Sequence, residues 1–113
     1  MLTEAEGCAI LKKIFEARGY SIQENVHFQE GNVSFNADGW DPVKRVGFEY
    51  MTHGAGDYED LDGDEMNELV ERMKKGELFF FIIDQAMEAY ELEWGASRFL
   101  DEVERRRAAK GGA

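Results

Sequence analysis

The chain of 113 residues is poor in cysteine, in proline and in long apolar runs. Its single cysteine, Cys8, excludes an intrachain disulfide and argues against a cysteine-based zinc site. The longest apolar run, residues 78–83, is too short to span a bilayer. The first seven residues, MLTEAEG, carry glutamates where a secretory signal carries positive charge. From these absences we expect a cytoplasmic protein with no membrane-spanning segment.

Basic residues are also scarce, since 13 Lys and Arg stand against 24 Asp and Glu and give a formal net charge of −11. Such a charge repels nucleic acid and anionic membranes at long range, so we expect neither as a partner. It favours a basic protein partner, a cation, or no charged partner. With 43% hydrophobic residues, the chain can form one packed core, and we expect a single domain over residues 1–113.

The first residues predict an amphipathic helix over about 3–18. Thr3 and Glu6 have the spacing of a capping box, in which each side chain satisfies a backbone N–H group at the start of the helix. Gly19 is a typical residue just after a helix. Four apolar side chains then recur at helical spacing and predict the buried face: Ile10, Leu11, Ile14 and Phe15.

Three strands with alternating apolar and polar residues are predicted next, over about 20–30, 33–38 and 45–52. The first hairpin has a two-residue Gly31-Asn32 turn, and pairing Glu30 with Val33 makes the apolar faces of both strands agree. That first strand is expected to place four apolar residues on one side: Tyr20, Ile22, Val26 and Phe28. The second turn, at Asp41-Pro42, pairs Asp41 with Val46.

The remaining segments complete an α+β pattern. We predict a flexible acidic loop over about 53–64, and then a helix with the apolar stripe Met66, Leu69, Val70 and Met73. The run 78–83 is typical of a buried central strand parallel to the third strand. A short helix over 86–93 is expected to bury Met87, Tyr90 and Trp94, and a last helix is expected to start at Ser97. A frayed tail follows from about 109. The sequence thus predicts a four-stranded mixed sheet in the order α-β-β-β-α-β-α.

Two carboxylates are brought together by this strand pairing. If Asp41 pairs with Val46, then Asp38 lies directly opposite Glu49 on the polar face of the sheet. Two like charges so placed repel each other unless a cation or a proton intervenes. The pair is either a metal-binding site or two solvent-facing residues of a half-exposed sheet.

This arrangement resembles the PD-(D/E)XK, or restriction-endonuclease-like, superfamily over about residues 3–109. The resemblance implies that Asp38 and Glu49 bind Mg²⁺ or Mn²⁺, with Glu6 of the first helix completing the site, and that metal-activated water cleaves a phosphodiester. In that superfamily a lysine stands two residues after the glutamate, where this chain has Met51. The resemblance therefore implies a degenerate or inactive member, unless Lys44 or Lys75 supplies the amine.

Four residues on the same predicted polar face are candidates for partner binding: Trp40, Met51, His27 and His53. An exposed tryptophan beside acidic groups is typical of an interface anchor. We therefore expect a non-catalytic, acidic binding protein of the immunity or antitoxin type, with a basic protein partner and no cofactor. A divalent-metal nuclease using Asp38 and Glu49 is the alternative, and self-association through Trp40 and Met51 is a third hypothesis.

Overall fold

The computed structural model of the chain describes residues 1–52 and 63–111. Its elements, in chain order, are α1 (Glu4–Ala17), β1 (Gln23–Glu30), β2 (Val33–Asp41), β3 (Val46–Met51), α2 (Gly63–Lys74), β4 (Phe79–Asp84) and α3 (Ala89–Gly111). The predicted α+β class and element order are confirmed. Residues 53–62 of the predicted acidic loop lie outside the described residues. The last two positions of that prediction, 63 and 64, belong instead to the start of α2.

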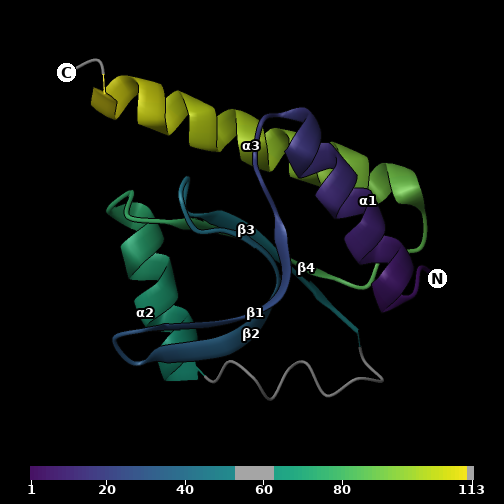
Figure 1. Cartoon of the computed structure of the whole chain (residues 1–113), viewed down its shortest axis with the longest axis horizontal. Helices are drawn as coiled ribbons and strands as arrows, with labels where there is room; N and C mark the ends of the chain where they lie inside the picture. Colours follow the sequence, from purple (N-terminus) through teal and green to yellow (C-terminus); the bar gives the residue numbers. More distant parts are fainter. Residues whose placement is uncertain (53–62, 112–113) are drawn as a thin grey trace.

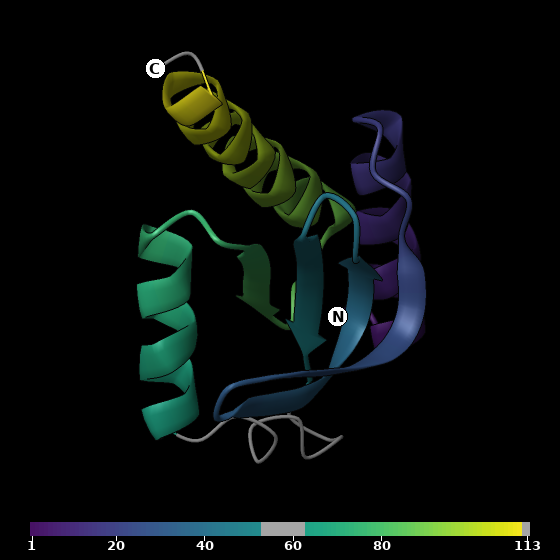
Figure 2. The same cartoon turned by 60° about the vertical axis from the view of Figure 1, so that its left-hand side comes forward.

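The four strands form one mixed sheet in the order β1-β2-β3-β4. The first three strands are antiparallel neighbours, whereas β4 is parallel to β3 and follows it through the crossover helix α2 (Figure 1). The prediction of a central position for β4 is wrong, because this strand lies at the edge of the sheet. Its side chains are apolar on both faces because helices cover both faces of the sheet (Figure 2).

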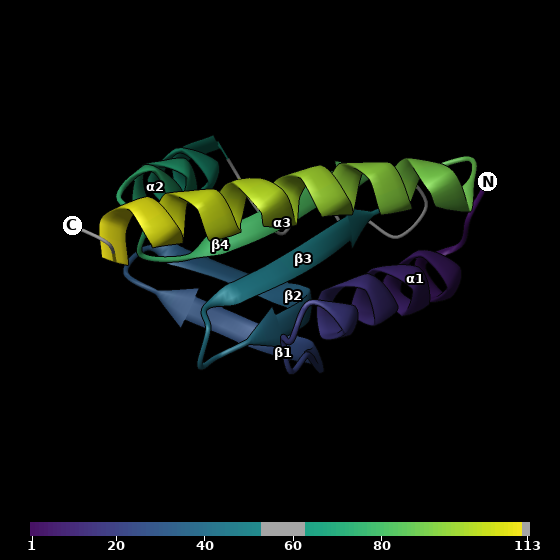
Figure 3. The ribbon, with the colours of Figure 1, turned by 90° about the horizontal axis from the view of Figure 1, so that it is seen from above.

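An apolar core lies on each face of the sheet. On one face, α1 and α3 pack together against β3, with Leu11, Phe15, Phe48 and Leu100 fully buried. On the other face, Leu69 of α2 packs on aromatic residues of the sheet: Phe28, Phe35, Trp40 and Phe80. α3 lies on the same face of the sheet as α1 and contacts β4 on that face (Figure 3). This helix therefore packs on one face of the edge strand.

The chain around β1 contributes to both cores. Tyr20 and Ile22 precede the strand and pack with α1 and α3, whereas Val26 and Phe28 pack on the α2 side. The prediction that all four lie on one side is therefore wrong. The cause is Asn25, whose φ of 53° interrupts the regular alternation between the pairs Glu24–Gly39 and Val26–Ala37. From Val26 onward, the predicted hairpin register is confirmed.

The two predicted C-terminal helices are one continuous helix, α3. Its core stripe has regular helical spacing across the predicted break and consists of Leu92, Ala96, Leu100 and Val103. Ser97 lies inside the helix and does not cap a new one, and α3 continues to Gly111 where a frayed tail is predicted. Because the stripe faces the sheet, the residues Met87, Tyr90 and Trp94 point away from the core, contrary to the prediction. No helix among the described residues is long and apolar enough to cross a membrane.

The two tryptophans are expected to differ sharply in fluorescence, because Trp40 is 5% exposed and Trp94 is 66% exposed. We expect the Trp94→Phe variant, which keeps only Trp40, to emit at shorter wavelength than the wild type and to resist quenching by acrylamide. A neutral quencher is used because the acidic protein repels iodide. Strong quenching of the variant would contradict the buried position of Trp40.

Candidate functional site

The pairing that was predicted to join Asp38 and Glu49 is present at the turn end of β2 and β3. Asp41 pairs with Val46, and the pairs Trp40–Gly47 and Gly39–Phe48 follow. Beyond them, Asp38 turns its carboxylate to the backbone, and its Oδ2 accepts a hydrogen bond of 2.7 Å from the N–H of Tyr50. The side-chain carboxylate thus satisfies a backbone N–H of β3 that a backbone carbonyl of a neighbouring strand would otherwise accept from.

Glu49 is not on a solvent-facing sheet surface, since its exposed fraction is 4%. Met51 is equally buried, at 7%, so the prediction of a half-exposed polar face that presents Met51 to a partner is wrong. The reason is that β3 is an interior strand, with β2 and β4 on its sides and helices over both faces of the sheet. All six residues of β3 are buried.

Asp38 borders a small acidic cleft between α1 and the irregular part of the β1–β2 hairpin. The cleft has a volume of about 450 Å³ and is lined by Glu4, Ala5, Cys8, Ala9, Glu24, Asn25 and Asp38. Burial, together with the charge of Asp38 and the hydrogen bond to it, raises the pKa of the Cys8 thiol. The thiol is therefore protonated at neutral pH, which makes it a poor nucleophile.

Glu6, which the resemblance places in the metal site, belongs to the N-terminus of α1. The Oε1 of Glu6 accepts a 2.9 Å hydrogen bond from the N–H of Thr3. In return, the Thr3 hydroxyl accepts a hydrogen bond from the N–H of Glu6. The hydrogen bonds from Thr3 lower the pKa of Glu6. The predicted capping box is confirmed, and it is Glu4, not Glu6, that lines the cleft with Asp38.

The two lysines considered as substitutes for the missing catalytic amine have other contacts. Lys44 Nζ donates a 2.9 Å hydrogen bond to the carbonyl oxygen of Gly19, and Lys75 lies in a pocket at the end of α2. Lys12 approaches the acidic cleft, with its Nζ 3.4 Å from the Oε2 of Glu24.

Over residues 1–52 and 63–111, no group of three or more His, Cys, Asp or Glu is arranged to hold a metal ion. Calorimetric titration with Mg²⁺ and Mn²⁺ is the test of the nuclease alternative.

The predicted partner-binding residues do not form one exposed face. Trp40 is buried in the α2-side core, where its ring stacks on Phe80 at a centroid distance of 4.7 Å. His27 is exposed and lies opposite Asn36 as predicted, with its Nδ1 2.9 Å from Asn36 Oδ1 and its Nε2 3.2 Å from Ser34 Oγ. His53 lies outside the described residues.

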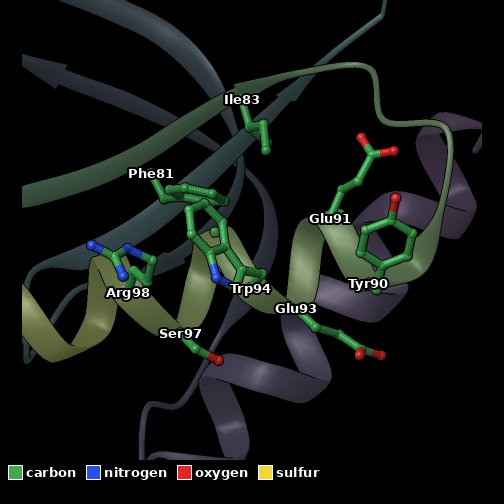
Figure 4. Close-up of a pocket in the computed structure, with 9 residues that line it drawn as sticks. Phe81, Ile83, Tyr90, Glu91, Glu93, Trp94, Ser97 and Arg98 are labelled. Carbon is green, nitrogen blue, oxygen red and sulfur yellow. The ribbon is translucent and has the colours of Figure 1, made fainter.

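The prominent exposed apolar surface lies elsewhere, on the N-terminal half of α3 and the residues just before it. Met87, Tyr90 and Trp94 have exposed fractions of 58%, 67% and 66%. Beside them, Phe81 and Ile83 of β4 are only partly buried, and together these elements form a groove of about 920 Å³ (Figure 4). We call this feature the α3–β4 groove, lined by Phe81, Ile83, Tyr90, Glu91, Glu93, Trp94, Gly95, Ser97 and Arg98.

Trp94 is the central side chain of the groove. Its indole lies beside the ring of Phe81, and the guanidinium of Arg98 is over the indole at 4.9 Å from the ring centroid (Figure 4). Gly95 has no side chain between the helix and β4, and an added Cβ there would lie 3.1 Å from the Phe81 ring. The helix can therefore approach the edge strand closely while Trp94 stays at the surface.

Sequence reasoning missed this groove because it divided α3 in two. A signal for the correct assignment is present in the sequence: Leu92, Ala96, Leu100 and Val103 form one stripe at helical spacing across Ser97. Once that stripe faces the core, Tyr90 and Trp94 must face outward.

Comparisons with protein-family models, with curated proteins and with solved structures find no match to this chain.

Proposed function

We propose that this protein is a cytoplasmic, non-catalytic interaction module that binds an extended, basic segment of a partner protein in the α3–β4 groove. The observation that supports this proposal is the combination of exposed aromatic side chains with an acidic rim. Trp94 and Tyr90 are each about two-thirds exposed, at 66% and 67%. Large exposed aromatic groups beside a groove are typical of the residues that dominate binding energy in protein interfaces.

The charges around the groove support the proposal of a basic partner. Glu91 and Glu93 line it, and the exposed residues Asp84 and Glu88 lie in the segment that leads from β4 into α3. Arg98 also lines the groove, and its guanidinium is positioned over the indole of Trp94. Lysine or arginine side chains on the partner would meet carboxylates at the rim while apolar side chains contact the indole.

The position of β4 at the sheet edge favours an extended segment over a helix. The N–H of Phe79 donates to the carbonyl oxygen of Arg45, on the β3 side of the strand. Successive residues of a strand direct their N–H and C=O groups to opposite sides, so those of Ile82, three residues later, point toward the outer edge. At the start of the strand, the N–H of Phe80 also points outward but donates to Met73 Sδ of α2 at 3.4 Å. A partner strand can therefore pair beside Ile82, with its side chains reaching the groove.

The proposal is tested with two synthetic octapeptides, one alternating leucine with lysine and one alternating leucine with glutamate. We expect the lysine peptide to shift the amide resonances of Phe81, Ile82 and the first half of α3, and to change Trp94 emission. Binding should weaken as salt concentration rises. Trp94→Ala should lower the affinity by about tenfold, or about 1.4 kcal/mol, because the anchor is removed.

Val43→Ala is the matched control, because Val43 is an apolar side chain with an exposed fraction of 88% in the turn between β2 and β3. This variant should bind the lysine peptide as the wild type does. Equal binding of the glutamate peptide, or resonance shifts that spare β4 and α3, would overturn the proposed function.

A further inference from the structure

A second surface of this acidic protein is strongly basic. Where the C-terminal ends of α2 and α3 meet, a pocket of about 480 Å³ is lined by Lys74, Lys75, Gly76, Phe79, Arg105, Arg106, Arg107, Ala109 and Lys110. Six of the chain's 13 basic residues are in this set, and over residues 1–52 and 63–111 no acidic residue lines the pocket. We call this feature the basic pocket.

Two of these cations complete the end of helix α2. The guanidinium of Arg106 donates to the carbonyl oxygen of Lys74 at 2.9 Å, and Lys110 Nζ donates to that of Lys75 at 3.2 Å. Cations at a helix C-terminus are favourable because the last carbonyl groups carry partial negative charge. Capping therefore accounts for two of the six residues, and four remain to be explained.

Nearby carboxylates neutralise only part of the charge of these six basic residues. Lys74 is 3.3 Å from Glu71, and Arg105 is 2.6 Å from Glu102. The two helix C-termini contribute roughly half a negative charge each. After both corrections the pocket keeps about three positive charges by this dipole estimate, so it attracts anions although the whole chain is acidic.

Two of the three arginines of the pocket are held in place before any ligand binds. Arg106 and Arg107 lie over the ring of Phe79 at 5.2 and 5.1 Å, and that ring is buried at 3% exposure. Stacking of this kind restricts the guanidinium groups and lowers the entropy lost on binding. Planar guanidinium groups form paired hydrogen bonds with phosphate oxygens, which lysine supports with a point charge.

We propose that the basic pocket binds a phosphate group of a small soluble ligand. The small size follows from the volume of the pocket and from the charge of the rest of the chain, where seven basic residues stand against all 24 acidic ones. A nucleic acid strand that continued beyond the pocket would meet this negative surface. A single phosphate or diphosphate group avoids it.

The test is a titration of the full chain with inorganic phosphate, with pyrophosphate and with single-stranded DNA, followed by amide resonances. We expect saturable shifts at residues 74–76 and 105–110, with pyrophosphate binding more tightly than phosphate because it carries more charge. Lys75→Glu and Arg107→Glu should each weaken pyrophosphate binding by at least about tenfold, as removal of a charge-assisted contact does. Lys75 has no packing role in the core, so its variant is expected to fold.

Lys13→Glu on the exposed face of α1 is the control, because it makes the same charge change away from the pocket. It should leave pyrophosphate binding unchanged, and so should Trp94→Ala, which separates this site from the α3–β4 groove. Amide resonance shifts that do not saturate with pyrophosphate would overturn the proposal. So would an equal reduction of these shifts in the Lys75→Glu and Lys13→Glu variants. Tighter binding of DNA than of pyrophosphate would overturn the assignment to a small ligand.

Discussion

Replacing Gly47 by alanine is expected to lower the free energy of unfolding by about 3 kcal/mol or more, at the upper end for overpacked sites. An added Cβ would overlap the carbonyl oxygen of Gly39 on the neighbouring strand, and would lie 2.8 Å from the Phe80 ring and 2.9 Å from the Trp40 ring. The carbonyl oxygen belongs to a paired backbone and cannot rotate away as a side chain can. The methyl group therefore has to separate β3 from β2.

Urea denaturation followed by circular dichroism measures this loss. Gly63→Ala is the control, because an added Cβ at the first residue of α2 meets no atom of the described residues within 4 Å. It should change the stability by less than about 1 kcal/mol, in the stabilising direction, since alanine favours the helix. A loss of less than about 1 kcal/mol for Gly47→Ala, well below the usual penalty for overpacking, would contradict the close approach of β2 and β3. Such a result would also question the placement of β4, which pairs with β3 at Gly47–Phe80.

Features that depend on neighbours in the sequence could be predicted. The Thr3–Glu6 capping box and the Gly31-Asn32 turn are set by a few adjacent residues, and the turn fixes the pairing from Glu30–Val33 to Val26–Ala37. The parallel placement of β4 follows from its connection to β3 through a crossover that contains a helix. Its edge position does not follow from its composition, because helices on both faces of a sheet make an edge strand as apolar as a central one.

The sites were harder to predict because they depend on backbone irregularities and on distant segments. Strict alternation from Asp38 places Trp40 on the polar face. In the structure, however, Ala37 and Trp40 share the α2-side core, so the alternation shifts between them. The basic pocket joins residues about 30 positions apart, at 74–76 and 105–110, through contacts such as that of Arg106 with Lys74. No local pattern in the sequence predicts that meeting.

Replacing Asp41 by asparagine is expected to lower the free energy of unfolding by about 2 kcal/mol at pH 7, the range for hydrogen bonds to a charged group. Asp41 is 2% exposed, and its carboxylate accepts three backbone hydrogen bonds, from Ser21 at 2.8 Å and from Val43 and Lys44 at 2.9 Å each. These bonds tie the chain after α1 to the turn that sets the β2–β3 register. The asparagine amide has one acceptor oxygen where the carboxylate has two, so at least one buried N–H loses its partner.

The loss should depend on pH in a defined direction. Burial acts to raise the pKa of Asp41, but the N–H groups of Lys44, Ser21 and Val43 outweigh it and hold that pKa below its ordinary value. A carboxyl group with a lowered folded-state pKa stabilises the fold above its unfolded pKa of about 3.9, and this contribution disappears as the pH falls through the folded value. The difference between wild type and Asp41→Asn should therefore be full at pH 7 and shrink below about pH 4.

Urea denaturation at several pH values between 7 and 3 measures the effect, and Asp101→Asn is its control. The Asp101 carboxylate has a partner too, the guanidinium of Arg18 at 2.8 Å, but the Asp101 side chain is 68% exposed. Its replacement should lower the stability by less than about 1 kcal/mol at any pH, as is usual for exposed ion pairs. A difference for Asp41→Asn that persists unchanged at pH 3 would show that the shape of the amide, and not the lost charge, weakens the turn. The carboxylate would then not be the group that holds β2 and β3 in register.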